Sequence, residues 1–353
     1  MSFQFSKSRA TCFFSILTCY FLVSGALQGA TEPESIRGYT MGTTYVVKVF
    51  QGKGEQPVKK KELHLKIEAT LKEVNRQMST YIKDSELSLF NRDRRVDIWH
   101  PVSADTAFVA ARALEISQAT GGSFDATLGP LVNLWGFGPD DRPVKIPESK
   151  LLDDTLKKTG YRLYSVQVNP PALKKTEASL YLDFSGIAKG FGVDKVAEDI
   201  ESFGHKNYMV EIGGEIRTSG QKGLEAWKIS IEKPEAGVKG RSVYKVLNLT
   251  QAAVATSGDY RNYYEKDGKR YSHIIDPRTG FPLNHGLISV TVVSDTAINA
   301  DAWATAFFVA GPKKIKELAE KLKLAVFFVS RENGAFVEWS SQQFRQMESA
   351  AAG

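Results

Sequence analysis

Apolar residues recur along the chain at spacings that predict a mixture of strands and helices. Residues 39–50 are rich in β-branched side chains and predict a strand, which a polar turn rich in Gly and Lys follows. A helix is predicted next, from apolar residues at helical spacing: Leu63, Ile67, Leu71, Val74 and Met78. A second helix is predicted after Ser103 as its N-cap, with Gly121 and Gly122 ending it.

The middle of the chain predicts a loop and then a strand, a glycine-rich turn and a helix. Residues 124–143 have the turn residues of a loop but are too aromatic for a simple solvated linker, so these aromatics need something to pack on. Residues 180–184 form a short apolar run that predicts a strand. The turn SGIAKGFG follows, and residues 193–204 form an amphipathic stretch.

The last third of the chain predicts most of the remaining strands. Strands are expected at residues 209–212, 227–232, 244–249 and 287–293, and a helix is expected around residues 300–310. Two strands joined through Asn333 and Gly334, at residues 325–330 and 335–340, predict a closing hairpin, and residues 342–353 are expected to be loose. With no repeat and no long linker, we expect a single compact α+β domain in which strands and helices are interspersed.

Composition and charge exclude several classes of protein. The chain has 353 residues, 42% hydrophobic and 24% charged, as in a globular protein that can bury a sizeable core. Its formal net charge of +6 falls by two, to +4, without Lys7 and Arg9 of the leader described next. No large basic surface follows from that charge, so nucleic acid is not an expected partner.

The first residues have the pattern of a secretory signal peptide. Lys7 and Arg9 precede an apolar run at residues 12–23, and small residues follow it. We expect residues 1–26 to be the signal peptide, with cleavage near Ala26 or Ala30, and residues 27–353 to be the enzyme domain. A membrane anchor is the alternative, but the run is shorter than the roughly 20 apolar residues that span a bilayer.

Both cysteines lie in this leader, at Cys12 and Cys19. The mature protein would therefore contain no cysteine, which excludes disulfide, thiol and cysteine–metal chemistry. Cys19 as a lipid-modified first residue is a second alternative. It is less favoured, because Thr18 is a poor residue before such a cysteine.

Two segments suggest chemistry on anionic phosphate, although each also has a purely structural interpretation. Gly186, Gly190 and Gly192 mark a strand-to-helix turn, where exposed backbone amides favour phosphate, and the turn also contains a lysine. A tight structural turn explains those glycines equally well. Asp301 and Thr305 are four residues apart, so on a helix they lie on the same face. Their carboxylate and hydroxyl are hard oxygen ligands of the kind that suits Mg²⁺. In the alternative interpretation, the Thr305 hydroxyl bonds back to its own helix and Asp301 is solvated.

A third segment contains a candidate general base. His273 stands at the edge of the turn DPRTG, which Asp276, Pro277 and Gly280 define. An unperturbed pKa of about 6.5 suits a histidine to proton transfer near neutrality, while a structural role is the alternative. No zinc-ligand spacing exists among the five histidines.

Five segments in this order resemble the ApbE family of FAD:protein FMN transferases. They are MGTTY, STYIKDSELSLFN, FDATLGPLVNLWGFG, DFSGIAKGFGVD, and the run from SGDYR through SHIIDPRTG to ADAWATA. The resemblance spans essentially all of the chain after the leader and implies an ApbE-like fold related to the T-fold. Three positions depart from the family pattern, at Ser185, Trp303 and Glu215.

The resemblance also implies a binding site. The residues expected to line an FAD site are Met41, Tyr81, Ser123, Phe124, Asp125, Asp183, Lys189 and Ile275. Asp301 and Thr305 match the family's Mg²⁺ ligands, joined by the main-chain carbonyl of Gly186. His273 matches a histidine that helps to activate the acceptor threonine, so His273 and Asp301 are the expected catalytic residues.

The implied reaction is a Mg²⁺-dependent transfer of the FMN half of FAD onto a protein threonine, which forms a phosphoester and releases AMP. Two alternatives remain at the same site: FAD hydrolysis to FMN and AMP, and a non-catalytic exported FAD-binding protein. The implied acceptors are exported or membrane-bound flavoprotein subunits. The enzyme is therefore expected in the periplasm, either free or associated peripherally with the outer face of the cytoplasmic membrane.

Overall fold

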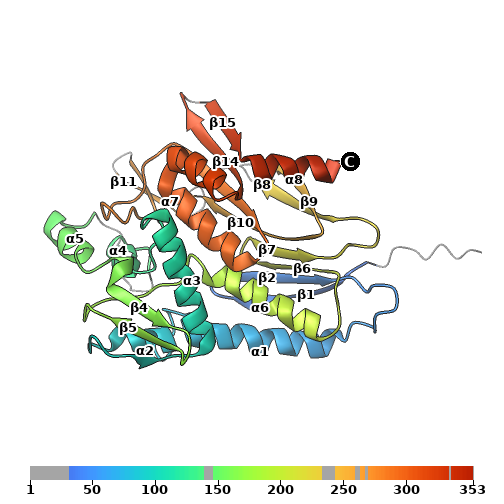
Figure 1. The fold of residues 1–353 in the computed structure, drawn as a ribbon, viewed down its shortest axis with the longest axis horizontal. Helices are drawn as coiled ribbons and strands as arrows, with labels where there is room; N and C mark the ends of the chain where they lie inside the picture. The colour runs from blue at the N-terminus through green and yellow to red at the C-terminus, as the bar shows by residue number, and fades with distance from the viewer. Residues whose placement is uncertain are drawn as a thin grey trace, which may run out of the picture. The chain divides into compact units, whose positions relative to one another are not determined.

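An eight-stranded antiparallel sheet organises the chain (Figure 1). The computed structural model describes residues 32–138, 146–232, 243–258, 263–266, 269–333 and 335–352. The predicted signal peptide and its cleavage sites lie outside these residues. In spatial order the strands of the sheet are β1 (Glu34–Thr40), β2 (Thr43–Val49), β6 (Tyr208–Ile212), β7 (Glu215–Ser219), β10 (Gln251–Gly258), β13 (Leu287–Ser294), β14 (Ala325–Glu332) and β15 (Ala335–Ser340).

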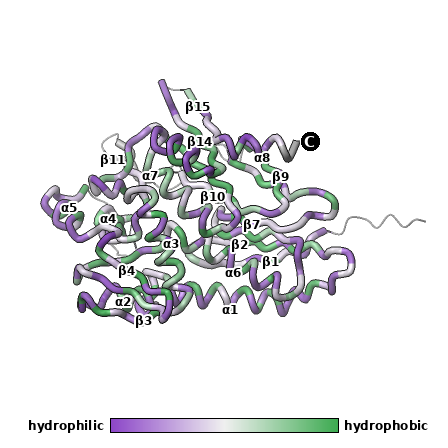
Figure 2. Tube along the Cα trace, in the orientation of Figure 1, coloured by the Kyte–Doolittle hydropathy of each residue, from purple (hydrophilic) through white to green (hydrophobic). Residues whose placement is uncertain are grey.

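Helices cover one face of this sheet and build the main core. Successive side chains of a strand point to opposite faces, so Val290 and Val292 of β13 meet the helices while Val293 points away from them. Figure 2 shows hydrophilic and hydrophobic residues alternating along α1, as expected for a helix with one face on the core. The helices of this layer are α1 (Lys60–Met78), α3 (Ala104–Thr120), α6 (Ala188–Ser202) and α7 (Ala297–Lys321).

The opposite face of the sheet is covered by a β-hairpin and the last helix. Strands β8 (Trp227–Glu232) and β9 (Val243–Leu249) pair with each other, and α8 (Gln342–Ala352) contacts β9 and β14. Phe344 of α8 is fully buried there and stacks on Phe327 of β14. This second cluster contains none of the residues predicted for catalysis or binding.

Smaller elements complete the described chain. Strands β3 (His100–Pro101), β5 (Ala172–Lys175) and β4 (Tyr164–Gln167) form a three-stranded sheet, and β11 (Tyr263–Lys266) pairs with β12 (Lys269–Ser272). Three short α-helices and a 3₁₀ helix lie between the larger elements: α2 (Glu86–Arg92), α4 (Gly129–Leu134), α5 (Ser149–Leu156) and η1 (Tyr161–Leu163). Within the described residues no helix combines the length and the apolar character needed to cross a bilayer.

Most of the predicted elements are confirmed, and the fold class is α+β as expected. The clearest case is α3, where the Ser103 side chain accepts a hydrogen bond from the Thr106 N–H and Gly121 ends the helix with φ 61°. A side-chain N-cap and a left-handed glycine are local signals, so the sequence alone locates both ends of this helix.

The single strand predicted at residues 39–50 is wrong. The chain reverses at Met41 and Gly42, which have φ values of 49° and 72°, and the segment contributes to both β1 and β2. Positive φ at both central residues suits the tight turn of a two-residue hairpin. The turn was missed because methionine seldom adopts this backbone conformation.

The prediction of a strand at residues 180–184 is also wrong, because the backbone at Leu182 forms hydrogen bonds with a side chain and not with another strand. Asn91 donates from Nδ2 to the Leu182 carbonyl at 2.8 Å and accepts from the Leu182 N–H at 2.8 Å. The segment is buried and apolar, as the sequence indicates, but this side chain takes the place of a neighbouring strand.

Two segments expected to lack regular structure contain helices. Residues 342–352, expected to be loose, form α8, because burial of Phe344 anchors them. The aromatic loop at residues 124–143 contains α4, and residues 139–143 lie outside the described part. Trp135 in this segment is fully buried and stacks on Tyr271, so the packing surface that its aromatics require is present.

Candidate active site

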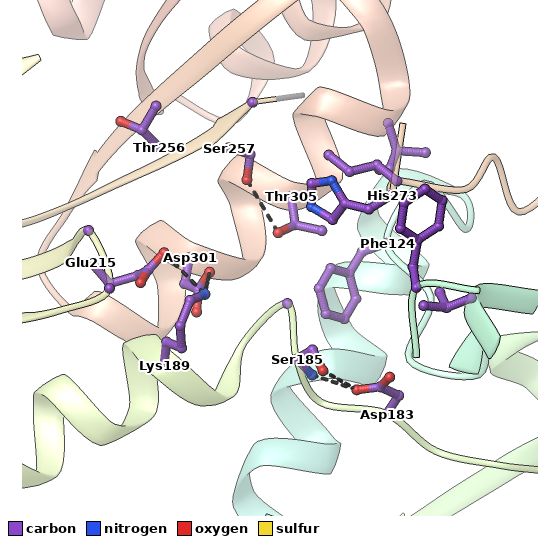
Figure 3. A pocket seen from close by; sticks show the side chains of 18 of the residues that line it. Phe124, Asp183, Ser185, Lys189, Glu215, Thr256, Ser257, His273, Asp301 and Thr305 are labelled. Atoms are coloured by element: carbon purple, nitrogen blue, oxygen red, sulfur yellow. Dashed lines mark hydrogen bonds and ion pairs between the residues drawn. The ribbon is translucent and has the colours of Figure 1, made fainter. Parts of the chain in front are cut away.

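Most of the predicted site residues line one cavity of about 810 Å³. They come from segments far apart in the sequence and converge as Figure 3 shows. The predicted residues that line the cavity are Tyr81, Ser123, Phe124, Asp125, Asp183, Gly186, Lys189, His273, Ile275, Asp301 and Thr305. Met41 does not line it. The Met41 side chain packs on α6, where a Cβ added to Gly192 would lie 2.9 Å from the Met41 Cε.

The N-terminal half of α7 carries the two candidate metal ligands. Asp301 and Thr305 lie one turn apart, and both face the cavity. Asp301 is 3% exposed, and its Oδ2 accepts a hydrogen bond of 2.9 Å from the Gly190 N–H. The Thr305 hydroxyl lies 3.4 Å from the Ser257 hydroxyl at the end of β10. Both candidate ligands therefore have fixed positions.

The start of α7 is held by a carboxylate from α6. Asp194 accepts hydrogen bonds from the Ala297 and Ile298 N–H groups at 3.0 and 2.9 Å. The same carboxylate pairs with Arg217 at 2.8 Å. It satisfies backbone donors that the helix leaves free at its first turn, which fixes α7 against α6.

The glycines of the SGIAKGFG turn have different roles. Gly186 lies in the turn before α6, whereas Gly190 and Gly192 lie within the helix. A Cβ at Gly190 would be only 2.2 Å from the Ala297 carbonyl oxygen, so this glycine allows α6 and α7 to pack closely. The turn interpretation holds for Gly186 alone. A Cβ there would lie 3.4 Å from the Thr305 Oγ1, so this backbone adjoins one of the candidate metal ligands.

Lys189 lies between two buried carboxylates. Its Nζ is 3.2 Å from Glu215 Oε1 and 3.7 Å from Asp301 Oδ1. Figure 3 shows the lysine between these two side chains. Burial alone would lower the pKa of Lys189, but the two carboxylates hold it above the usual value. Burial raises the pKa of the Glu215 carboxyl to about 8, against the opposing effect of Lys189. Sequence reasoning identified Glu215 only as a departure from the family, because its pairing requires β7 beside α6.

The opposite wall is made of loops. Phe124 is buried, and Asp125 accepts hydrogen bonds from the Thr127 N–H and hydroxyl and from the Tyr161 N–H. Burial raises the pKa of Asp125, although these hydrogen bonds oppose the shift. The carboxylate thus ties the loop of residues 123–125 to the chain near Tyr161.

Asp183 and Tyr81 lie at another part of the cavity. Asp183 Oδ1 accepts hydrogen bonds from the Ser185 N–H at 2.8 Å and from the Ser185 hydroxyl at 2.5 Å. The Asp183 N–H donates to the Ala126 carbonyl at 2.7 Å, which joins this segment to the 123–125 loop. Tyr81 is 69% exposed, so its ring stands free to cover a bound ligand.

His273 follows β12 and faces the cavity beside Phe137, with ring centroids 6.3 Å apart. The DPRTG turn that follows is closed by a hydrogen bond of 2.8 Å from the Gly280 N–H to the Asp276 carbonyl. Trp135 donates from Nε1 to the Gly280 carbonyl at 2.8 Å. Phe137, the ring beside His273, packs on a satellite cluster of four buried residues, Leu131, Trp135, Leu152 and Ile275.

The donor set of the cavity suits a hard cation. Asp301, Thr305 and the backbone at Gly186 offer oxygen atoms only, which are the ligands that Mg²⁺ prefers. Across the described residues, no three His, Cys, Asp or Glu side chains are close enough together to hold a metal. A site for a metal that is completed by substrate phosphate agrees with both findings.

Comparison with known proteins gives one consistent result. The ApbE family model matches residues 41–328. The FAD:protein FMN transferase of Haemophilus influenzae is 45% identical over 326 residues, which cover 91% of this chain and 93% of that protein. The protein of the same name from Escherichia coli K12 is 40% identical over 319 residues, covering 90% of this chain and 89% of that protein.

Solved structures agree with the sequence matches. The structure titled flavin transferase ApbE from Vibrio cholerae is 42% identical with a TM-score of 0.82, and the match covers 89% of this chain and 99% of that one. The apo flavinyl transferase ApbE of Pseudomonas stutzeri is 38% identical with a TM-score of 0.81, covering 91% and 98%.

Proposed function

Because the chain belongs to the ApbE family, we propose that it is an FAD:protein FMN transferase. It would move the FMN half of FAD onto a threonine hydroxyl of an acceptor protein and release AMP, with Mg²⁺ bound. One observation carries the proposal: the candidate metal ligands, a lysine, a histidine and the predicted flavin-site residues other than Met41 line one cavity. The names of the relatives support the activity, while the cavity supports the chemistry.

Asp301, Thr305 and the Gly186 carbonyl would hold the metal. The Gly190 N–H fixes one oxygen of Asp301, so the other oxygen is directed toward the cavity and Lys189. Bound Mg²⁺ would supply charge neutralisation at the pyrophosphate and at the departing AMP. Phosphoryl transfer depends mainly on such positioning and charge, which a rigid helix pair can provide.

Lys189 would bind the pyrophosphate from the first turn of α6. The Ala188 and Gly190 N–H groups of this turn donate to the Phe184 carbonyl and to the Asp301 carboxylate, so the lysine ammonium rather than these amides would meet the anion. Glu215 lies 3.2 Å from the ammonium and would hold it at the cavity wall, where the reacting phosphate would bind.

His273 would accept the proton of the threonine hydroxyl. The threonine oxygen then forms a bond to the FMN-side phosphorus, the bond from that phosphorus to the bridging oxygen breaks, and AMP leaves with the bonding electrons. Its ring contact with Phe137, which packs on the satellite cluster, places the imidazole at the cavity wall. A pKa near neutrality would suit it to this transfer.

Purified protein incubated with FAD and Mg²⁺, with and without an acceptor flavoprotein subunit, tests the proposal. We expect covalent flavin on the acceptor, detected by in-gel fluorescence, and none on an acceptor whose target threonine is replaced by alanine. Free FMN with an unmodified acceptor would show that the enzyme is a hydrolase instead. Unchanged FAD would indicate a binding protein.

The proposal includes an exported enzyme acting on exported or membrane-bound subunits, supported by the leader pattern at residues 1–26. The mature protein would begin near Leu27 or Thr31. N-terminal sequencing of protein from the periplasmic fraction tests this start, and a cytoplasmic product that retains Met1 would contradict it.

A further inference from the structure

Beyond the residues with predicted roles, the second half of α7 contacts the loop of residues 123–125. Lys314 donates from Nζ to the Thr120 carbonyl at 2.5 Å and to the Ser123 hydroxyl at 3.3 Å. A Cβ at Gly121 would lie 3.7 Å from the same Nζ, so the ammonium lies directly on the turn that ends α3. These contacts join positions more than 190 residues apart in the sequence.

The chemistry of this contact favours a lysine. The Thr120 carbonyl is at the C-terminus of α3, where unpaired carbonyls carry partial negative charge that a cation stabilises. Hydrogen bonds from a charged donor are also stronger than neutral ones. Both Lys314 and Ser123 are partly buried, so water screens the contact less than it would on an open surface.

The loop held in this way carries part of the proposed binding site. Ser123, Phe124 and Asp125 all line the cavity, and the Phe124 N–H donates to the Thr120 hydroxyl at 3.2 Å. The first turns beyond α3 therefore depend on Thr120, and Lys314 fixes Thr120 from outside.

α7 also carries the proposed metal ligands in its other half. The helix is interrupted between Thr305 and Lys314 by Gly311, with φ 77° and ψ 168°. This break changes the direction of the chain, and the following turn brings Lys314 to the end of α3. One helix thus carries the candidate metal ligands in its first half and, through Lys314, supports the 123–125 loop.

On the basis of the proposed function, we propose that Lys314 is a positioning residue for FAD. Its ammonium holds the 123–125 loop at a fixed place relative to Asp301 and Thr305, without touching the substrate. Lys314 therefore affects how tightly FAD binds more than how fast bound FAD reacts.

Lys314→Met tests this role, because it keeps most of the length of the side chain and removes its donors. We expect the Kd for FAD, measured by flavin fluorescence quenching, and the KM for FAD to rise about 10-fold or more, as for a lost charged hydrogen bond. The kcat at saturating FAD should stay within about threefold of the wild type, since the reacting groups are unchanged.

Two variants sharpen the test. Lys314→Arg keeps a charged donor and should recover most of the affinity. Lys313→Met removes the adjacent, exposed lysine and should bind FAD like the wild type. If Lys314→Met does not fold, Lys314→Gln provides the same comparison with a neutral donor.

The outcomes separate this inference from the proposed function. A wild-type protein that does not bind FAD would overturn the proposed function. Wild-type binding with equal affinity in folded Lys314→Met would overturn the role of Lys314 alone. A lower melting temperature with unchanged FAD affinity would show that Lys314 only stabilises the fold, which also contradicts the inference.

Discussion

The two walls of the cavity are built in different ways. The helix side consists of Lys189, Glu215, Asp301 and Thr305, which stand on α6, β7 and α7 and rest on the main core. The loop side consists of the 123–125 loop, whose Phe124 belongs to the main core, and of Phe137, His273 and Ile275 at the satellite cluster of four buried residues. The lysine and the candidate metal ligands therefore lie on the helix side, and the candidate base lies beside the smaller cluster.

This difference fits the two tasks of the proposed reaction. A pyrophosphate and a metal require charges at fixed positions, because electrostatic stabilisation is lost when its dipoles must reorganise. An acceptor protein must enter and leave at every turnover, which a wall of loops permits more easily. The comparison predicts that changes on the helix side abolish the chemistry, whereas those on the loop side reduce it.

Asp301→Ala should have the largest effect. Transfer should fall to about the uncatalysed background, because a metal ligand is lost, while FAD still binds measurably through the loop side. Equilibrium FAD binding and transfer kinetics at limiting Mg²⁺ measure the two properties. Asp295→Ala, which removes an exposed carboxylate just before α7, is the control and should retain both. Undiminished turnover of Asp301→Ala would place the metal site elsewhere.

His273→Ala should slow transfer by about 10² to 10⁴, the usual effect of losing a general acid–base group, with nearly unchanged FAD affinity. The wild type should show an acidic-limb pKa near neutrality that the variant lacks. His64→Ala on α1 is the matched control, because His64 does not line the cavity. Equal rates for wild type and variant from about pH 5 to 9 would exclude the base assignment.

Trp135→Ala tests whether the loop side depends on its satellite cluster. Removing this buried ring and its hydrogen bond to Gly280 should lower the free energy of unfolding by about 3–5 kcal/mol. Urea unfolding measures this loss of stability. Trp99→Ala is the control, because the Trp99 side chain is 42% exposed. A loss below about 1 kcal/mol would show that the cluster adds little to the loop side.

Gly190→Ala tests the close packing of the helix side. The new Cβ would meet the Ala297 backbone, so we expect a loss of about 1–3 kcal/mol in stability together with weaker transfer. Gly192→Ala on the same helix is the matched control, because its Cβ would meet the ends of side chains, Met41 Cε at 2.9 Å and Ile212 Cδ1 at 3.4 Å, and not the backbone of α7. If both variants are equally stable, close approach of α6 and α7 does not position Asp301.

Motifs in the sequence predict which residues gather at the cavity, whereas contacts made by tertiary packing are not predictable from it. Asp301, Thr305, Lys189 and His273 lie in motifs, so their approach to one cavity was expected, and strands such as β8 have the predicted bounds. The roles of Glu215 and Lys314 were not predictable, because each depends on a partner brought near by tertiary packing.

The errors in the fold have the same origin. The 180–184 segment looks like a strand because it is buried and apolar, but its hydrogen-bond partner is the side chain of Asn91. Residues 342–352 look polar and terminal, but Phe344 anchors them in a second core. The local sequence pattern indicates whether a segment is buried and how its apolar residues repeat. The segment against which it packs or forms hydrogen bonds is determined by the fold of the whole chain.

The most direct test of the central claim is the stoichiometry of one reaction. Enzyme, FAD, Mg²⁺ and an acceptor subunit are mixed under single-turnover conditions, AMP is quantified by chromatography, and flavin on the acceptor is quantified by intact-mass spectrometry. The account predicts one AMP for each flavinylated acceptor, with no free FMN. Equimolar AMP and free FMN with an unmodified acceptor, or covalent flavin without AMP, would contradict it.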